Sequence, residues 1–290
     1  MPELPEVETV RLALEQTVAG KTIGNVRVMR CDLRTRIPTD FERKLIASRI
    51  QSISRRGKYL QVHLSDGYVM VIHLGMSGTL EFHPDSGTFE PDIHDHVIFS
   101  LSNGLSLVYS DPRRFGQIYI LEAERIADTA PFKTMGPEPM GKDFTADYIS
   151  KALHAKKGPI KNALMDQKVV AGLGNIYVCE ALFYAGISPK RKAGTIAGRR
   201  SERLCRSIRD VLEKAIEAGG SSLKDYKKVD GSPGYFQHSF AVYDRTGRSC
   251  PGCDCIAKDR PRVDNISDGK GVRQIVQAGR STFYCPVRQR

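Results

Sequence analysis

The chain begins Met1-Pro2-Glu3-Leu4-Pro5-Glu6-Val7-Glu8-Thr9, and this stretch predicts the start of a helix. Proline suits the first helical turn because its φ is fixed near the helical value and its missing N–H has no partner there. Acidic residues in the first turn favour the positive end of the helix dipole. Apolar residues then recur at helical spacing, which predicts one buried face: Leu4, Val7, Val10 and Leu14.

The same stretch supplies a reactive amine if Met1 is removed, because Pro2 then carries a free secondary amine. An α-amino group titrates at about 7.7–8.0 and a lysine at about 10.4, so at neutral pH roughly 10% of the former but under about 0.1% of the latter is unprotonated. A secondary amine that attacks an aldehyde-like carbon forms a cationic iminium, which promotes elimination. Pro2 is therefore a candidate nucleophile and Glu3 a candidate proton carrier; the alternative is a helix start without chemistry.

Further along the chain, apolar residues alternate with polar ones from Lys21 to about Leu121, which predicts an antiparallel β-sandwich. Ser65-Asp66-Gly67 and Ser102-Asn103-Gly104 have the composition of hairpin turns. After a break at 134–139 the apolar spacing becomes helical. The predicted helices cover residues 148–153, 160–165, 176–185 and 199–218, and short strand-like pieces follow from 241.

Bulk composition limits the partners and the compartment. The chain has 290 residues, 40% hydrophobic, and a formal net charge of +11, which favours a polyanionic partner. No apolar run has the length of a membrane span and the first thirty residues do not resemble a secretory signal, so we expect a cytosolic protein. In a reducing compartment, clustered thiols favour a metal over disulfides, and four of the seven cysteines cluster near the end: Cys250, Cys253, Cys255 and Cys285.

A glycine-rich string, Ala171-Gly172-Leu173-Gly174-Asn175, precedes one predicted helix. Glycines at that position let backbone N–H groups approach a phosphate, which the helix dipole also favours. The alternative is an ordinary helix boundary capped by Asn175. The string lacks the remainder of the dinucleotide fingerprint and the complete Walker motif Gly-x4-Gly-Lys-Ser/Thr does not occur in the chain, so a nucleotide cofactor is not expected.

The string PELPEVETV at 2–10 resembles the amino-terminal signature of the formamidopyrimidine-DNA glycosylases, which excise oxidised purines and cut the strand. The resemblance runs from Pro2 to Gln289 and includes RRGKYL at 55–60, HLGMSG at 73–78, DPRRFG at 111–116 and GLGNIY at 172–177. It implies an α+β fold with an N-terminal catalytic β-sandwich over 1–133. A helical DNA-binding domain with a helix-two-turn-helix would cover 134–236, and a zinc-finger-like β-hairpin 237–290.

The resemblance also implies catalytic roles. Pro2 is the Schiff-base nucleophile, Glu3 the proton donor, and Lys58 a lysine that assists elimination. Arg280, in the string QAGRSTFY, reaches a phosphate near the lesion and supports the second elimination. Taken alone, Lys58 would be read as a solvated turn charge.

Other matching residues imply contacts with DNA. An enzyme that extrudes a base must fill the hole that it leaves in the duplex. By resemblance Met76, Arg113 and Phe115 fill it, although methionine is ordinarily core filling. Lys224-Asp225-Tyr226 match a lesion-covering loop. The implied phosphate contacts are His94, Lys156, Lys161 and Asn175.

The metal site departs from the family pattern, in which two Cys-x2-Cys pairs hold one zinc ion. Cys250, Cys253 and Cys285 match, but Arg288 occupies the fourth position, and an insertion around 256–271 carries Asp259, Asp264 and Asp268. We expect Cys255 to serve as the fourth thiolate for one Zn²⁺, with weakened affinity. The alternative is a metal-free hairpin held by its packing.

The sequence thus predicts a bifunctional DNA glycosylase and AP lyase of base excision repair. The expected partner is double-stranded DNA containing oxidised purines or abasic sites, bound by a monomer in a bacterial cytoplasm, associated with the nucleoid. Two alternatives stay open. One is the sister group that removes oxidised pyrimidines, against which Leu4 and the set of Met76, Arg113 and Phe115 argue. The other is a damaged-DNA-binding protein that does not cleave.

Overall fold

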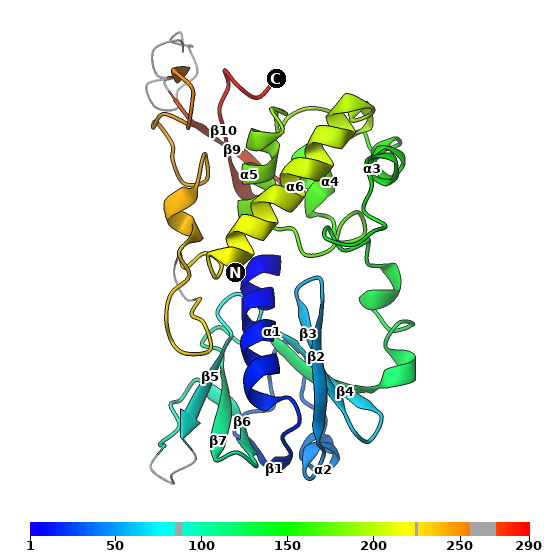
Figure 1. Ribbon diagram of the computed structural model, residues 1–290, viewed down its shortest axis with the longest axis vertical. Coiled ribbons are helices and arrows are strands. Elements are labelled where there is room, and N and C mark those ends of the chain that lie inside the picture. Colours follow the sequence, from blue (N-terminus) through cyan, green and yellow to red (C-terminus); the bar gives the residue numbers. More distant parts are fainter. Residues whose placement is uncertain (85–88, 224–225, 256–270) are drawn as a thin grey trace. The chain divides into compact units, whose positions relative to one another are not determined.

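A computed structural model describes residues 1–84, 89–223, 226–255 and 271–290 (Figure 1). The chain forms two compact units. The first comprises Met1–Thr134 with Ala215–Gln237, and the second Met135–Lys214 with His238–Arg290. The predicted inserted residues Asp259, Asp264 and Asp268, and Lys224 and Asp225, lie outside the described residues. None of the described helices combines the length and apolar character needed to cross a bilayer.

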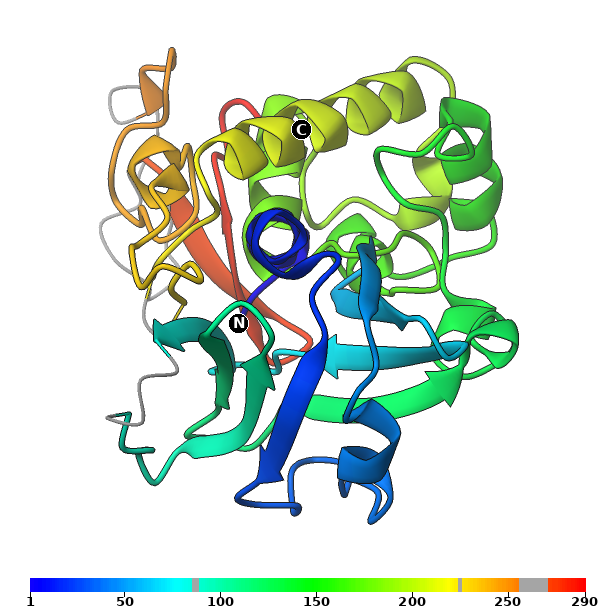
Figure 2. The same ribbon diagram turned by 60° about the horizontal axis from the view of Figure 1, so that its bottom comes forward.

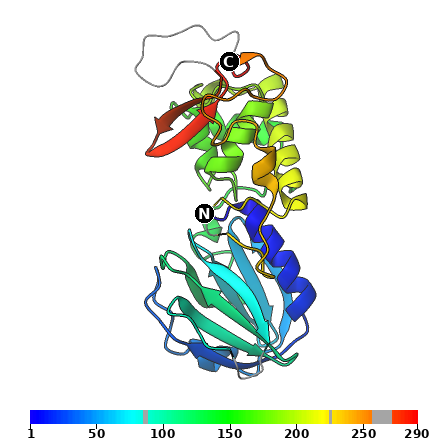
Figure 3. The ribbon, with the colours of Figure 1, turned by 90° about the vertical axis from the view of Figure 1, so that its left-hand side faces the viewer.

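The first unit is an antiparallel sandwich, as the alternating sequence predicts. Among the described residues one sheet has the order β1-β6-β7-β5 and the other β2-β3-β4-β8, and the two sheets face each other (Figure 3). The strands are β1 (Ile23–Val28), β2 (Ile50–Arg56), β3 (Tyr59–Leu64), β4 (Tyr68–His73), β5 (Thr79–Pro84), β6 (Asp95–Leu101), β7 (Leu105–Ser110) and β8 (Gln117–Glu122).

Both predicted hairpin turns are present, between β3 and β4 and between β6 and β7. Gly67 and Gly104 have φ values of +81° and +75° there, a conformation that glycine adopts without steric cost. Residues at alternate positions of both sheets, such as Val62 and Phe99, share one buried core. The apolar residue at every second position of the sequence therefore marks the face of each strand that points into the core.

Helix α1 (Leu4–Val18) packs beside β2 and adds its predicted apolar face, including Val7 and Leu14, to the same core (Figure 1). A short helix, α2 (Phe41–Leu45), and the 3₁₀ turns η1 (Ala123–Arg125) and η2 (Phe132–Thr134) complete this part. Tyr226 and Val229 also join that core, so residues 215–237 belong with the sandwich. The division into three domains with boundaries at 133 and 236 stays a prediction.

The second unit is helical with one hairpin. Its helices are α3 (Ala146–Leu153), α4 (Ile160–Met165), α5 (Asn175–Tyr184), η3 (Ala193–Thr195) and α6 (Arg199–Glu217), whose last turn belongs to the first unit. The 3₁₀ turn η4 (Phe236–Ser239) leads to the tail, where β9 (Arg273–Gln277) pairs with β10 (Arg280–Tyr284). β10 contacts α5 (Figure 2). The predicted α+β class, with sandwich, helices and terminal hairpin, is confirmed.

Candidate catalytic and DNA-binding sites

The amino terminus is fixed by a capping box at the start of α1. Glu3 is the N-cap residue, and its side chain accepts a hydrogen bond from the backbone N–H of Glu6. In return, the Glu6 carboxylate accepts from the Glu3 N–H at 2.8 Å. Pro2 is buried, Glu3 is 2% exposed, and Met1 is 53% exposed. Pro2 and Glu3 are thus held rigidly, while the methionine that precedes them is accessible for removal.

Glu6 also ties this terminus to the segment that returns from the end of α6. Its second carboxylate oxygen accepts from the Ser221 N–H at 2.7 Å. Gly220, with φ +80°, approaches so closely that an added Cβ would lie 2.9 Å from the same oxygen. The hydroxyl of Tyr226 lies 3.4 Å from the Glu6 carbonyl oxygen. Because the Glu6 carboxylate accepts hydrogen bonds from two buried N–H groups, it fixes the position of the first turn of the helix.

Lys58 lies in the two-residue turn between β2 and β3, where Gly57 has φ +57°. The lysine is 8% exposed, so it is not a solvated turn charge. Arg55 links this turn to α1: its Nε donates to Glu8 at 2.7 Å and its guanidinium also donates to the Gly57 carbonyl at 2.9 Å. The structure therefore joins the Lys58 turn to the helix that begins with Glu3 and Leu4.

Two loops of the first unit carry the predicted wedge. Met76 is half-buried, whereas Arg113 and Phe115 are exposed, Phe115 by 44%. The Arg113 guanidinium lies over the Phe115 ring at 4.9 Å, a cation–π contact that keeps both groups together at the surface. The loops touch through their backbones, because a Cβ added to Gly75 would lie 2.5 Å from the Gly116 nitrogen.

His73 supports the first of these loops from beneath. Its Nδ1 accepts from the Gly75 N–H at 3.1 Å, which requires that nitrogen to be unprotonated. Burial first, and then the positive charges of Lys58 and Arg34, lower the pKa of His73 to about 4. The imidazole is therefore neutral at pH 7 and acts as an acceptor. His94, the residue just before β6, is exposed, and its role as a phosphate contact stays a prediction.

In the second unit the glycine-rich string forms the turn between α4 and α5. Gln167 organises it, since its side chain accepts from the Gly172 N–H at 2.8 Å and donates to the Leu173 carbonyl at 2.8 Å. Gly174 is the N-cap of α5, and Asn175 is the first helical residue. This arrangement places Asn175 at the positive end of a helix, where an anion is favoured.

Asn175 also connects α5 to the hairpin that carries Arg280. Its Nδ2 donates to the Ser281 carbonyl at 2.9 Å and lies 3.4 Å from the Tyr243 hydroxyl. Arg280 is exposed at the hairpin turn, next to Ser281. Two of the predicted DNA contacts, from different elements of this unit, are thus structurally coupled.

The two predicted lysine contacts differ in exposure. Lys156 is half-buried and its ammonium lies 3.4 Å from Asp166, the C-cap residue of α4. Lys161 lies on α4 and is fully buried. Their roles as phosphate contacts stay predictions.

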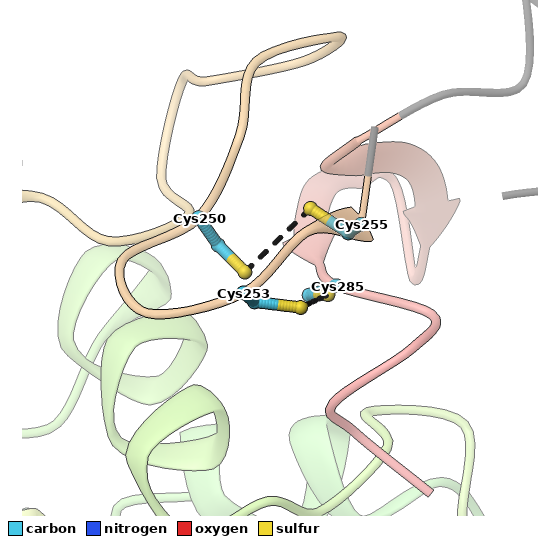
Figure 4. Close-up of side chains that lie close together, drawn as sticks. All are labelled: Cys250, Cys253, Cys255 and Cys285. Carbon is cyan, nitrogen blue, oxygen red and sulfur yellow. Dashed lines mark hydrogen bonds between the residues drawn. The ribbon is translucent and has the colours of Figure 1, made fainter. Parts of the chain in front are cut away.

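The four clustered cysteines converge in the second unit (Figure 4). Sγ of Cys250 lies 3.7 Å from that of Cys255, and Sγ of Cys253 lies 4.0 Å from that of Cys285. All four sulfurs lie within 4.8 Å of one another. Zinc–sulfur bonds of about 2.3 Å in a tetrahedron require sulfurs about 3.8 Å apart. The cluster therefore fits a tetrahedral metal ion with thiolate ligands, and Cys255 takes the fourth position.

Arg288, which stands where the family has its fourth cysteine, does something else. It donates to the Pro251 carbonyl at 2.8 Å, and its guanidinium lies 4.9 Å from the centre of the Phe183 ring. It thus holds the turn between Cys250 and Cys253 against α5. A guanidinium is not a metal ligand, so the substitution turns a ligand position into a structural support.

Sequence reasoning missed two buried carboxylates. Glu180 on α5 accepts backbone N–H bonds from Ala241, Val242 and Tyr243 at 2.8–3.0 Å, and burial raises its pKa. It is the one acidic residue within the apolar sequence NIYVCEALFY, a signal that could have found it. Asp111, the second, is the buried first residue of the loop that carries Arg113 and Phe115.

Comparisons with known proteins show which family this chain resembles. The model of the formamidopyrimidine-DNA glycosylase N-terminal domain matches residues 1–118, and that of the family's H2TH domain matches 135–227. The formamidopyrimidine-DNA glycosylases of Rhodospirillum rubrum and Rhodospirillum centenum are 49% and 50% identical to this chain, with 100% of each chain covered. A solved complex of a Lactococcus lactis Fpg variant with DNA containing Fapy-dG has a TM-score of 0.87 at 34% identity and covers 100% of both chains. The Thermus thermophilus MutM (Fpg) structure has a TM-score of 0.84 at 36% identity and covers 99% of this chain and 98% of that one.

Proposed function

Since the chain belongs to the formamidopyrimidine-DNA glycosylase family and is a DNA glycosylase of DNA repair, we propose that it is bifunctional. It excises oxidised purines, namely 8-oxoguanine and ring-opened formamidopyrimidines, and then cleaves the strand at the abasic site. The Lactococcus lactis relative bound to DNA containing Fapy-dG supports this substrate class. The observation that carries the proposal is the capping box that fixes Pro2 and Glu3 at the start of α1.

The proposed chemistry starts once Met1 is removed. The Pro2 nitrogen attacks C1′ of the damaged nucleotide, the bond from C1′ to the base breaks, and Glu3 protonates the opening sugar. The iminium then withdraws electrons, so a proton leaves C2′ and the 3′ phosphate departs in β-elimination. A second, δ-elimination removes a proton from C4′ and releases the 5′ phosphate. Water then hydrolyses the iminium, which frees Pro2 and the sugar fragment and leaves a gap with phosphate at both ends. Lys58 and Arg280 assist these eliminations.

DNA binding is proposed to use both units. Met76, Arg113 and Phe115 fill the hole left by the extruded nucleotide, and the exposed stacked pair of Arg113 and Phe115 supports this role. The helix start at Asn175 favours a phosphate. The remaining proposed phosphate contacts are His94, Lys156 and Lys161. The formal net charge of +11 favours binding of the chain to a polyanion such as DNA.

Zinc is the metal that the cysteine cluster suits best, because four thiolates in a tetrahedron form a structural site of this ion. Cys250, Cys253, Cys255 and Cys285 would hold it. A bound zinc ion supplies folding free energy rather than chemistry. The chain's own residues then keep β9 and β10 in place so that Arg280 points from their turn.

The test compares two forms of the protein on a duplex containing 8-oxoguanine, with borohydride present. One form retains a peptide before Pro2, which makes the nitrogen an amide without a basic lone pair. In the other, a protease has removed the same peptide so that Pro2 comes first. We expect covalent trapping and strand cleavage only in the second form; equal trapping in both forms would contradict the proposal.

The same assay separates the two alternatives. Activity on thymine glycol in place of 8-oxoguanine would assign the oxidised-pyrimidine group. Tight binding to the lesion duplex without a trapped adduct, in the form that begins with Pro2, would assign a protein that binds damage and does not cleave. The set of Met76, Arg113 and Phe115 favours the purine enzyme over the oxidised-pyrimidine group.

A further inference from the structure

The buried carboxylate of Asp111 joins the two loops that carry the wedge residues. Asp111 follows β7 and has no exposed surface. Its Oδ1 accepts from the Ser77 hydroxyl at 2.6 Å. Its Oδ2 accepts from the Gly116 N–H at 2.8 Å and from the Tyr109 hydroxyl at 3.2 Å. One carboxylate therefore contacts the loop of Met76 and both ends of the loop of Phe115.

Ser77 extends this connection to Arg113. While its hydroxyl donates to Asp111, its oxygen accepts from the Arg113 backbone N–H at 3.2 Å. The residue next to Met76 thus bonds directly to the backbone of the arginine in the other loop. Because Ser77 is also buried, water does not compete for these bonds.

Backbone contacts make the arrangement rigid. Gly75 has φ +64°, and a Cβ there would lie 2.5 Å from the Gly116 nitrogen. A Cβ on Gly116 would collide with the Tyr109 hydroxyl and lie 3.0 Å from Asp111 Oδ2. Glycine is therefore required at both positions, and the loops have one way to fit together. Above this packed layer Arg113 and Phe115 remain exposed.

We propose that Asp111 is a positioning residue that sets the spacing between Met76 and the Arg113–Phe115 pair, so that they enter the duplex as one preformed wedge. This rests on the proposed function. Extrusion of a nucleotide costs free energy because stacking and pairing are lost. A wedge that is already ordered adds less to this cost, because its side chains lose less conformational entropy when they enter the hole. Asp111 does not touch DNA; it acts through Ser77 and Gly116.

Asp111→Asn tests this with little change in volume. An amide offers one acceptor oxygen and places an NH₂ donor against donors, so the loops lose their common anchor. We expect excision of 8-oxoguanine from a duplex to fall about tenfold or more. Borohydride trapping on a single-stranded oligonucleotide with an abasic site should stay within about twofold of the parent, because no partner base has to be displaced.

A second readout reports the wedge itself. With 2-aminopurine opposite the lesion, the parent should change the fluorescence as the wedge enters, and Asp111→Asn should reduce that change. Ser77→Ala removes the same link through a small side chain and should shift both readouts in the same direction, so it carries the test if Asp111→Asn does not fold. Glu15→Gln is the matched control. The Glu15 carboxylate accepts a hydrogen bond of 2.6 Å from the Ile53 N–H, and neither residue belongs to these loops.

Equal losses on duplex and single strand, or parent-like duplex activity in both variants, would overturn the positioning role while leaving the proposed function intact. A parent protein that processes neither substrate would instead overturn the proposed function and this role with it.

Discussion

The wedge loops of the first unit and the cysteine cluster of the second are held in different ways. The loops at 73–78 and 111–116 are joined by hydrogen bonds of Asp111 and Ser77 and by glycine backbones in contact, and His73 bonds within the first loop. The cluster brings four free thiols to 3.7–4.0 Å in its two closest pairs. The first arrangement is stable through the protein's own groups, whereas the second is the site proposed for a metal ion. Perturbations should therefore affect one and spare the other.

Removal of the metal should have the largest effect and should affect the second unit alone. Structural zinc contributes about 10 kcal/mol or more to small modules, so a chelator or Cys255→Ser should disorder the hairpin and lower DNA affinity about 100-fold or more. Hydrogen exchange should show lost protection in β9 and β10 and unchanged protection in β2 to β8. Cys31→Ser, outside the cluster, is the control. A zinc stoichiometry near zero in the purified parent would contradict the assignment.

Acidification should act on the first unit through His73. Its folded pKa of about 4 lies below the ordinary 6.5, so the unfolded chain binds more protons between these values. Stability from the neutral imidazole is thus fully present above about pH 6.5 and is lost as the pH falls towards 4. The full shift corresponds to on the order of 3 kcal/mol.

Urea unfolding at several pH values would measure this effect. His73→Asn should flatten the pH dependence in that window, and the exposed His154→Asn controls for the substitution itself. An unchanged slope in His73→Asn would show that the imidazole is not the group responsible.

The smallest expected effect tests whether the Lys58 turn depends on α1. Arg55→Lys loses the fork that contacts Glu8 and Gly57 together, and we expect a loss of about 1 kcal/mol in unfolding free energy. The ratio of β- to δ-elimination products should also change, because the turn carries Lys58. Arg11→Lys contacts the same Glu8 without touching the turn and should leave that ratio as in the parent. Identical ratios in both variants would break the proposed link.

Much of the fold is predictable because it depends on local patterns. Alternating apolar residues predict the strands, and the helical spacing predicts α3 to α6 to within two residues at each end. The glycine-rich string likewise predicts a helix start, and α5 begins at Asn175, while the role of Asn175 as a phosphate contact stays a prediction.

What the sequence did not predict depends on long-range contacts. Glu6 bonds to Ser221, which lies 215 positions away, so the return of residues 215–237 to the sandwich has no local signal. The burial of Lys58 and the three N–H bonds of Glu180 likewise depend on segments that meet only in the folded chain. Cys255 is the exception, because Arg288 occupies the usual position of the fourth ligand and Cys255 is the remaining thiol next to Cys253 in the sequence.

In the proposed mechanism, the amine of Pro2 forms the covalent bond to the sugar. The direct measurement is peptide mapping by mass spectrometry of the adduct trapped with borohydride on an 8-oxoguanine duplex. We predict that the amino-terminal peptide begins with Pro2 and carries the nucleotide mass. An adduct on a lysine peptide such as that of Lys58, with the Pro2 peptide unmodified, would contradict the account.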